Sequence, residues 1–257
     1  MILILLALAV APSAAIIWYI YTKDQHEKEP PHLLLIAFAL GVLSVIPALA
    51  GGYFGEFLGL SEAYTWSSIM VYAFGVVALS EELAKFIFLR FVMYPHKEFN
   101  EPYDGIIYAV MIGMGFATFE NLLYVQAGGL EVAILRMFTA VPAHAAFGII
   151  MGYYVGLAKF DYANRNKLLF LGLFWAILLH GAYDFFLMLN SYAFLSLVSI
   201  AILYLSIYDA QRSIAIHQAN SPFHPENLPT EITFNDLEQK EDCLLYTSDA
   251  ADEWLRG

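Results

Sequence analysis

Long apolar stretches separated by short polar segments cover most of the chain. Seven of these stretches reach the length of about 20 residues that an α-helix needs to cross a bilayer. Their approximate limits are 2–21, 32–55, 65–93, 103–125, 131–158, 167–189 and 191–210. The pattern therefore predicts an all-α, polytopic transmembrane bundle of about seven spans within residues 1–212. The first stretch has no basic start and its apolar run continues to Tyr21, so we expect an uncleaved span and not a signal peptide cut near Ala14.

The composition supports a membrane protein. Hydrophobic residues make up 60% of the 257 residues and charged residues 14%, and the mean hydropathy is +0.62. A soluble domain has about 25% charged residues, so we exclude that class. Residues 213–257 hold nine acidic residues against Lys240 and Arg256, which places −7 of the net charge of −12 in this segment. Because there is no basic stripe, we expect no nucleic-acid partner.

Positive charges alternate between the connecting segments, which predicts the orientation. The first, third and fifth connections and the segment after the last stretch carry Lys or Arg, whereas the second and sixth carry none. The fourth has at most Arg136. Because Lys and Arg are enriched in cytoplasmic loops, we expect the N-terminus outside and the C-terminus in the cytoplasm of a bacterial or archaeal cell.

The C-terminal segment differs from the rest of the chain. Residues 213–242 contain Pro222, Pro225 and Pro229 among polar residues, which indicates a disordered acidic cytoplasmic tail. Residues 243–257, which include the single cysteine Cys243, resemble a translated sequencing adapter, and we interpret them as non-native read-through. A native disordered tail is the alternative.

Ionisable residues inside the third apolar stretch form the first candidate for a functional site. Glu81 and Lys85 are four residues apart and share a helix face, and Glu82 lies about 100° round the helix. Ionisable groups cost about 2.5–3.5 kcal/mol each near the centre of a span, which makes them functional candidates. If Lys85 neutralises one carboxylate, the other is available for acid–base chemistry on water. An ion pair that only holds helices together is the alternative.

Two ridges of small residues accompany polar residues in the fourth and fifth stretches. Glu120 and Asn121 follow a ridge at spacing four, made by Gly105, Ala109, Gly113 and Ala117. His144 begins a second such ridge with Gly148, Gly152 and Gly156. Small residues let helices approach closely, so we expect Glu120 and His144 to face the protein interior.

The sixth stretch carries His180 and Asp184, four residues apart, so that the carboxylate can orient the imidazole. A helix rises 1.5 Å per residue, which places all these groups about 14–25 Å from the expected cytoplasmic edge. Helices that run in opposite directions thus bring their polar groups to similar depths, as an active site requires.

The motifs together resemble those of the PrsW intramembrane proteases, relatives of the CAAX prenyl endopeptidases. The motifs are Glu-Glu-x-x-Lys at 81–85, Phe-x-x-x-Glu-Asn at 116–121, His144 before glycines, and His-x-x-x-Asp at 180–184. Their order on successive stretches also matches, over residues 65–190. The resemblance implies cleavage of a membrane-anchored protein, of which anti-sigma factors are the best-known kind.

We expect hydrolysis by activated water. In this hypothesis Glu81 or Glu82 is the general base, and His144 and His180 position the water or stabilise the oxyanion. Lys85 and Asp184 support them, as do Glu120 and Asn121. The family is often described as metalloproteases, and His144, His180 and Glu82 are enough ligands for zinc. Because His-Glu-x-x-His is absent, both the zinc site and metal-free glutamate chemistry remain open, and we assign no metal.

Two other classes of function use similar residues. A proton- or ion-coupled transporter would use the buried carboxylates as a relay, but the sequence has no inverted repeat of the kind common in transporters. A non-catalytic membrane scaffold would not need Glu81, Glu82, His144 and His180 together.

Overall fold

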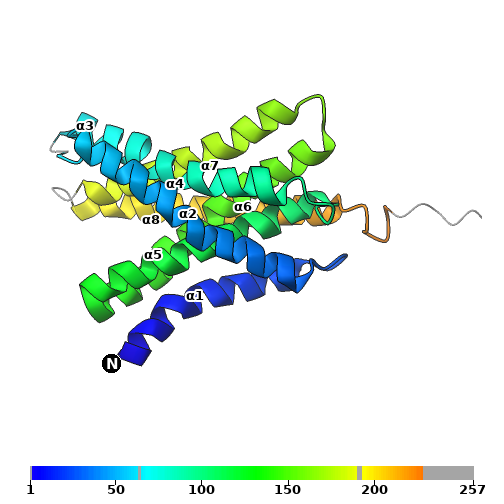
Figure 1. The fold of residues 1–257 in the computed structure, drawn as a ribbon, viewed down its shortest axis with the longest axis horizontal. Coiled ribbons are helices and arrows are strands. Elements are labelled where there is room, and N and C mark those ends of the chain that lie inside the picture. The colour runs from blue at the N-terminus through cyan, green and yellow to red at the C-terminus, as the bar shows by residue number, and fades with distance from the viewer. Residues whose placement is uncertain (1, 63–64, 190–192, 228–257) are drawn as a thin grey trace, which may run out of the picture. The chain divides into compact units, whose positions relative to one another are not determined.

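The computed structural model describes residues 2–62, 65–189 and 193–227. Residues 1–224 form one compact unit, and a second unit begins at Pro225. All regular elements among the described residues are helical (Figure 1). They are α1 (Ile2–Lys23), α2 (Pro31–Phe57), α3 (Trp66–Met70), η1 (Val71–Ala78), α4 (Leu79–Phe88), η2 (Leu89–Met93), α5 (Pro102–Phe138), α6 (Ala140–Phe160), α7 (Arg165–Met188), η3 (Ala193–Leu195) and α8 (Ser196–Ala219).

The all-α transmembrane architecture is confirmed, whereas the number of seven spans is not. Among the described residues, four helical stretches are long and apolar enough to cross a membrane: Leu3–Lys23, Pro31–Phe57, Pro102–Phe160 and Arg165–Met188. The third of them contains both α5 and α6, and the expected span 65–93 is divided into four short elements. The expected span 191–210 begins in residues that lie outside the described part. Seven spans therefore remain a prediction.

The boundary between the fourth and fifth stretches differs from the expected one. We expected a connection near 126–130, but α5 continues through a kink at Gly129, where φ is 68°, and ends at Phe138. Glycine adopts a positive φ without the steric cost that a side chain adds. Only this residue of α5 has non-helical backbone angles, and helical geometry resumes after it. As a result Arg136 lies on the last turn of α5 and not in a loop.

The third stretch is continuous but not regular. The π-helical segments η1 and η2 lie on either side of α4, which carries Glu81, Glu82 and Lys85. π-Helical turns inside α-helices occur frequently at functional sites. The three ionisable residues themselves lie in α-helical geometry. Glu81 and Lys85 therefore share one face of the helix, as expected from their spacing.

Helices α5 and α6 pack through the two predicted ridges (Figure 1). A Cβ atom added to Gly113 would lie 3.3 Å from the carbonyl oxygen of His144, and one added to Gly148 would lie 3.2 Å from that of Ala109. At Gly105 and Gly152 a methyl group would collide with the backbone of the other helix. This close antiparallel packing places the backbone of His144 opposite Gly113, from where its side chain reaches Glu120 about two turns further along α5.

The remaining helices surround this pair. Helices α1 and α2 pack against α5, and α7 and α8 pack against α6. Helix α8 continues to Ala219 with Ile214 and His217 buried, so the first seven residues of the expected tail, 213–219, are helical instead. The expectations for 228–242 and for 243–257 fall outside the described residues.

Candidate active site

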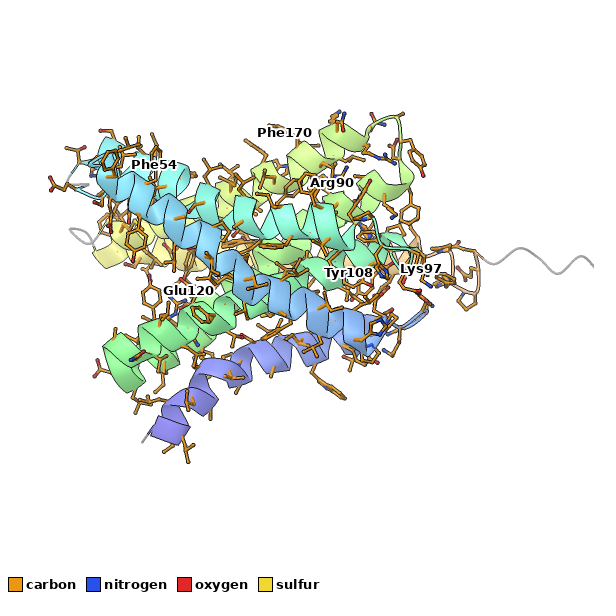
Figure 2. All side chains as sticks on the ribbon, viewed as in Figure 1. Phe54, Arg90, Lys97, Tyr108, Glu120 and Phe170 are labelled. Atoms are coloured by element: carbon orange, nitrogen blue, oxygen red, sulfur yellow. The ribbon has the colours of Figure 1, made fainter. Side chains whose placement is uncertain are left out.

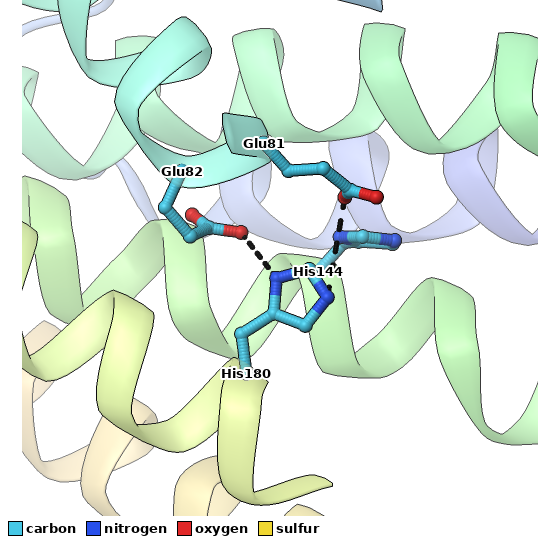
Figure 3. A group of neighbouring side chains, drawn as sticks. All are labelled: Glu81, Glu82, His144 and His180. Atoms are coloured by element: carbon cyan, nitrogen blue, oxygen red, sulfur yellow. Dashed lines mark hydrogen bonds and ion pairs between the residues drawn. The ribbon is translucent and has the colours of Figure 1, made fainter. Parts of the chain in front are cut away.

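Glu82 and Lys85 form the centre of a buried polar cluster. Nζ of Lys85 donates a hydrogen bond to Oε1 of Glu82 at 2.7 Å, and the same oxygen lies 2.8 Å from Nδ1 of His180. The side chain of Glu82 is 1% exposed and that of Lys85 is 6% exposed. A buried charge requires a partner, and Glu82 has two: Lys85 on α4 itself, and His180 on α7, whose contact Figure 3 shows.

Glu81 has a different environment. Its Oε2 atom lies 3.5 Å from Nζ of Lys85 and 4.0 Å from Nε2 of His180, but it has no hydrogen-bond partner within the described part of the chain. Its side chain retains 15% exposure. The sequence could not distinguish the two adjacent carboxylates. In the structure, Glu82 accepts hydrogen bonds from two side chains, whereas Oε2 of Glu81 accepts none from the described residues.

His144 links α4 to the end of α5. Its Nδ1 lies 3.2 Å from Nζ of Lys85, and its Nε2 lies 2.9 Å from Oε2 of Glu120. Because an ammonium group can only donate, Nδ1 is the acceptor and Nε2–H donates to Glu120. Lys85 therefore determines the tautomer of this imidazole.

Arg136, for which the sequence predicted no role in the site, holds the α5 residues of the site. Its Nη2 lies 2.7 Å from Oε2 of Glu120, and its Nε donates to Oδ1 of Asn121 at 2.9 Å. The Nδ2 atom of Asn121 donates to the carbonyl oxygen of Ala9 on α1 at 3.0 Å. Figure 2 shows Glu120 on the part of α5 that carries these contacts.

His180 is held from three sides. Its Nε2 lies 3.2 Å from Oδ2 of Asp184, the partner expected from the spacing, and its ring stacks on Phe147 with centroids 5.3 Å apart. The ring of His144 lies edge-on to it at 5.3 Å. Both nitrogens of His180 therefore face carboxylate oxygens.

The same group has the composition of a metal site. Glu81, Glu82, His144 and His180 each offer one ligand atom, and these atoms all lie within 4.8 Å of one another. Two imidazoles and carboxylates are the ligands of catalytic zinc, so the residue types and their spacing fit. The ammonium of Lys85 contacts Oε1 of Glu82 and Nδ1 of His144, and a metal ion would have to replace these contacts.

The structure thus brings all eight residues singled out in the sequence into one network. Arg136 was missed as a partner because its role depends on the kink at Gly129, which returns the last turns of α5 toward Glu120. The signal that could have identified Arg136 is the presence of an arginine inside an apolar stretch. The sequence analysis also did not single out the acidic residues Glu27 and Glu29, which follow α1, and Asp104, which lies in the first turn of α5. These residues lie at or beyond the ends of the apolar stretches.

Comparisons with known proteins agree with this site. A sequence model described as PrsW family intramembrane metalloprotease matches residues 29–208. The chain is 42% identical to Protease PrsW of Oceanobacillus iheyensis over 183 residues, which are 71% of this chain and 82% of that protein. It is 41% identical to Protease PrsW of Geobacillus kaustophilus, over 72% of this chain and 80% of the relative. It is 40% identical to Protease PrsW of Bacillus subtilis, over 71% of this chain and 82% of that relative.

No solved structure matches the chain. The family match covers more than half of the chain, and it includes all the residues of the site except Ala9. With its apolar helices and its buried Glu and His residues, the chain belongs to the PrsW family of intramembrane proteases.

Proposed function

We propose that Glu81 is the general base that activates water for cleavage of a membrane-anchored protein, with Glu82 as its supporting neighbour. The observation that carries this assignment is the buried Oε2 atom of Glu81, which has no hydrogen-bond partner among the described residues. Glu82 already receives hydrogen bonds from Lys85 and His180. A base must have a free lone pair in reach of the proton that it removes, and Glu81 meets this requirement.

The water would lie between Glu81 and His180. Oε2 of Glu81 and Nε2 of His180 are 4.0 Å apart, a separation that one bridging water can span with hydrogen bonds to both. Asp184, which lies 3.2 Å from the same nitrogen, and the stacked ring of Phe147 hold the imidazole of His180 in place, and the water would share Nε2–H with Asp184.

The proposed reaction uses one proton carrier. Glu81 takes a proton from the water, and the oxygen attacks the carbonyl carbon of the scissile peptide bond. The oxyanion that forms would take the hydrogen bond from Nε2–H of His180 that Asp184 receives in this structure. The C–N bond then breaks, and Glu81 returns the proton to the leaving nitrogen. The products are a carboxylic acid and an amine, which exchange a proton to give a carboxylate and an ammonium group, and Glu81 is again ionised for the next cycle.

A bound zinc ion would be held by Glu82, His144 and His180. It would supply Lewis-acid polarisation of the carbonyl group and a lower pKa for bound water. Glu81 keeps the same role with or without metal, because its Oε2 atom is the one that the surrounding side chains leave without a hydrogen bond.

The substrate would dock in a groove between α2 and the η1–α4 segment, whose lining includes none of the eight residues of the site. The groove has a volume of about 380 Å³, and its lining runs from Pro47 to Leu60 on one side and from Gly75 to Ile87 on the other. It includes Ser80, the residue before Glu81, and most of its wall is apolar. A hydrophobic segment of a membrane protein is the kind of chain that matches it, and an anti-sigma factor with one span is our candidate.

The test is cleavage of such a single-span protein by purified enzyme in liposomes. We expect Glu81→Gln to reduce the cleavage rate by about 10²–10⁴-fold, the usual contribution of general acid–base catalysis, at unchanged abundance. Glu131→Gln, at an exposed position on α5, is the matched control and should cut like wild type. Equal cleavage by Glu81→Gln and wild type would refute the assignment. Proton or ion flux without any peptide product would favour a transporter, and neither activity would favour a scaffold.

A further inference from the structure

A second acidic cluster lies away from the protease site, where the α1–α2 connection meets the start of α5. Glu27, Glu29 and Asp104 each offer a carboxylate oxygen, and these three oxygens lie within 4.8 Å of one another. Asp104 precedes Glu120 by 16 residues on the same helix, which corresponds to about 24 Å. In Figure 2, Tyr108 lies toward the end of the bundle that carries Lys97, away from Glu120.

Two of the three carboxylates are almost completely buried and only half satisfied. Glu29 is 1% exposed and Asp104 is 0% exposed. Oε1 of Glu29, Oδ1 of Asp104 and Oε2 of Glu27 are buried without a hydrogen-bond partner in the described part of the chain. Buried polar atoms are nearly always hydrogen-bonded, and an exception often marks the place of an ion or a water molecule.

The protein holds the other oxygen of each buried carboxylate in place. Oε2 of Glu29 accepts a hydrogen bond from the hydroxyl group of Tyr108. Oδ2 of Asp104 accepts hydrogen bonds from the backbone N–H groups of Asn100 and Glu101, at 2.7 and 2.8 Å. One oxygen fixed by the protein and one left open is the arrangement expected of a carboxylate that binds a metal ion, because outer contacts orient the ligand.

Among the described residues, no basic side chain forms an ion pair with the cluster. Nζ of Lys28 donates to the backbone carbonyl oxygens of Tyr21 and Asp24. The ion pairs found among the described residues include none with Glu27, Glu29 or Asp104. Asp24, which is 1% exposed, has two more buried oxygens without a partner. Buried carboxylates this close repel one another unless a cation joins them or they share a proton.

We infer that Glu27, Glu29 and Asp104 form a binding site for a hard divalent cation, Mg²⁺ or Ca²⁺, separate from the protease site. All the ligands are oxygen atoms, which these ions prefer over the nitrogen ligands that suit zinc. The ion joins the α1–α2 connection to the first turn of α5. Ser221, just after α8, donates to the neighbouring Glu101, so the site lies where three helices meet. This inference does not depend on the protease assignment.

The test is ion-dependent stability of the full chain in detergent after treatment with a chelator. We expect millimolar Mg²⁺ or Ca²⁺, added in separate samples, to raise the unfolding temperature above that in NaCl of equal ionic strength, because an ion that binds only the folded state stabilises it. The comparison of the two ions identifies which one binds more tightly. Terbium is the direct probe: Tyr108, whose hydroxyl group bonds to Glu29, should sensitise its luminescence.

The variants Glu29→Gln and Asp104→Asn keep the shape of the site and remove the charge. We expect both variants to lose the terbium signal and the rise in unfolding temperature that Mg²⁺ or Ca²⁺ causes. In ion-free buffer they should unfold at the same temperature as wild type or at a higher one. Glu62→Gln, at an exposed position, should respond like wild type. If neither variant accumulates, Glu27→Gln replaces them. The inference is wrong if no ion shifts wild type, if the variants respond like wild type, or if stability depends on pH and not on the ions, as shared protons would produce.

Discussion

Nζ of Lys85 lies 3.2 Å from Nδ1 of His144, although the two residues belong to different helices, α4 and α6. This contact joins two halves of the site. On one side Lys85 holds Glu82, and on the other Nε2–H of His144 donates to Glu120, which also pairs with Arg136. Opposite charges thus pair at both ends, Lys85 with Glu82 and Arg136 with Glu120, and the imidazole of His144 joins the two pairs.

Replacement of Lys85 by methionine should therefore affect stability as well as catalysis. The variant leaves Glu82 with His180 alone and removes the donor that sets the tautomer of His144. Loss of one partner of a buried pair costs about 3–5 kcal/mol, so we expect lower abundance, a lower unfolding temperature and reduced cleavage. Lys167→Met, at an exposed position, is the control. Wild-type stability in Lys85→Met would show that the contact is not structural.

The position of Lys85 also leads to a prediction about metal. Because its ammonium contacts Oε1 of Glu82 and Nδ1 of His144, it competes with a metal ion for the same donors. We expect less than one zinc ion per chain in protein purified without added metal, measured by elemental analysis beside activity with and without chelator. One zinc ion per chain, lost together with activity in His144→Ala, would favour the metalloprotease mechanism instead.

Arg136 should prove essential for the order of the site. We expect Arg136→Gln to reduce both the unfolding temperature and the cleavage rate, because Glu120 and Asn121 lose their shared donor. The side chains of Arg136 and Glu120 keep 13% and 17% exposure, so the loss should fall at the lower end of the range of about 3–5 kcal/mol for buried pairs. Arg212→Gln, at an exposed position on α8, provides the comparison. Unchanged cleavage by Arg136→Gln would mean that the kinked end of α5 is dispensable.

The groove between α2 and the η1–α4 segment can be filled at Gly75 without disturbing the backbone. Gly75 lines it, and a Cβ atom at this position would have no heavy atom within 4 Å. We expect Gly75→Leu to raise KM for a membrane-anchored substrate at normal abundance. Gly52 has equally open surroundings and is not among the lining residues, so Gly52→Leu is the matched control. If both variants cut alike, the substrate enters by another route.

The C-terminal segment should divide into a required and a dispensable part. Truncation after Asn227 removes none of the described structure, and we expect normal insertion and cleavage. Truncation after Arg212 removes the buried residues Ile214 and His217 and the bond from Ser221 to Glu101, so we expect poorer accumulation, measured by membrane immunoblot. Equal levels of the two truncated chains would show that the last turns of α8 add little stability.

The membrane architecture and the residues of the site could be predicted because both leave a local signal. Apolar stretches of the length of a span identify the helices, and an ionisable residue within such a stretch is costly enough to stand out. The spacing of four predicted the contacts of Lys85 with Glu81 and of His180 with Asp184, because such residues share one helix face. The two ridges of small residues predicted the close packing of α5 and α6 for the same reason.

Helix ends and partners across helices could not be predicted in this way. The kink at Gly129 keeps Arg136 on α5. Two adjacent glycines, Gly128 and Gly129, are compatible with a loop as well as with a kinked helix, and the sequence does not distinguish the two. The start of the tail was misplaced because Ile214 and His217 are buried only by contact with other helices. The cluster of Glu27, Glu29 and Asp104 gives no signal in sequence because its members are separated by a whole helix.

The sequence by itself determined that this chain lies in a membrane and which side chains are available for chemistry, since hydropathy and spacing along one helix are local properties. Only the tertiary structure decided which of two adjacent glutamates is free. Glu82 faces Lys85 and His180, whereas Oε2 of Glu81 has no hydrogen-bond partner in the part of the chain that the structure describes. The reason is physical: neighbours about 100° apart on a helix meet different partners, and those partners come from helices that the chain reaches only after folding.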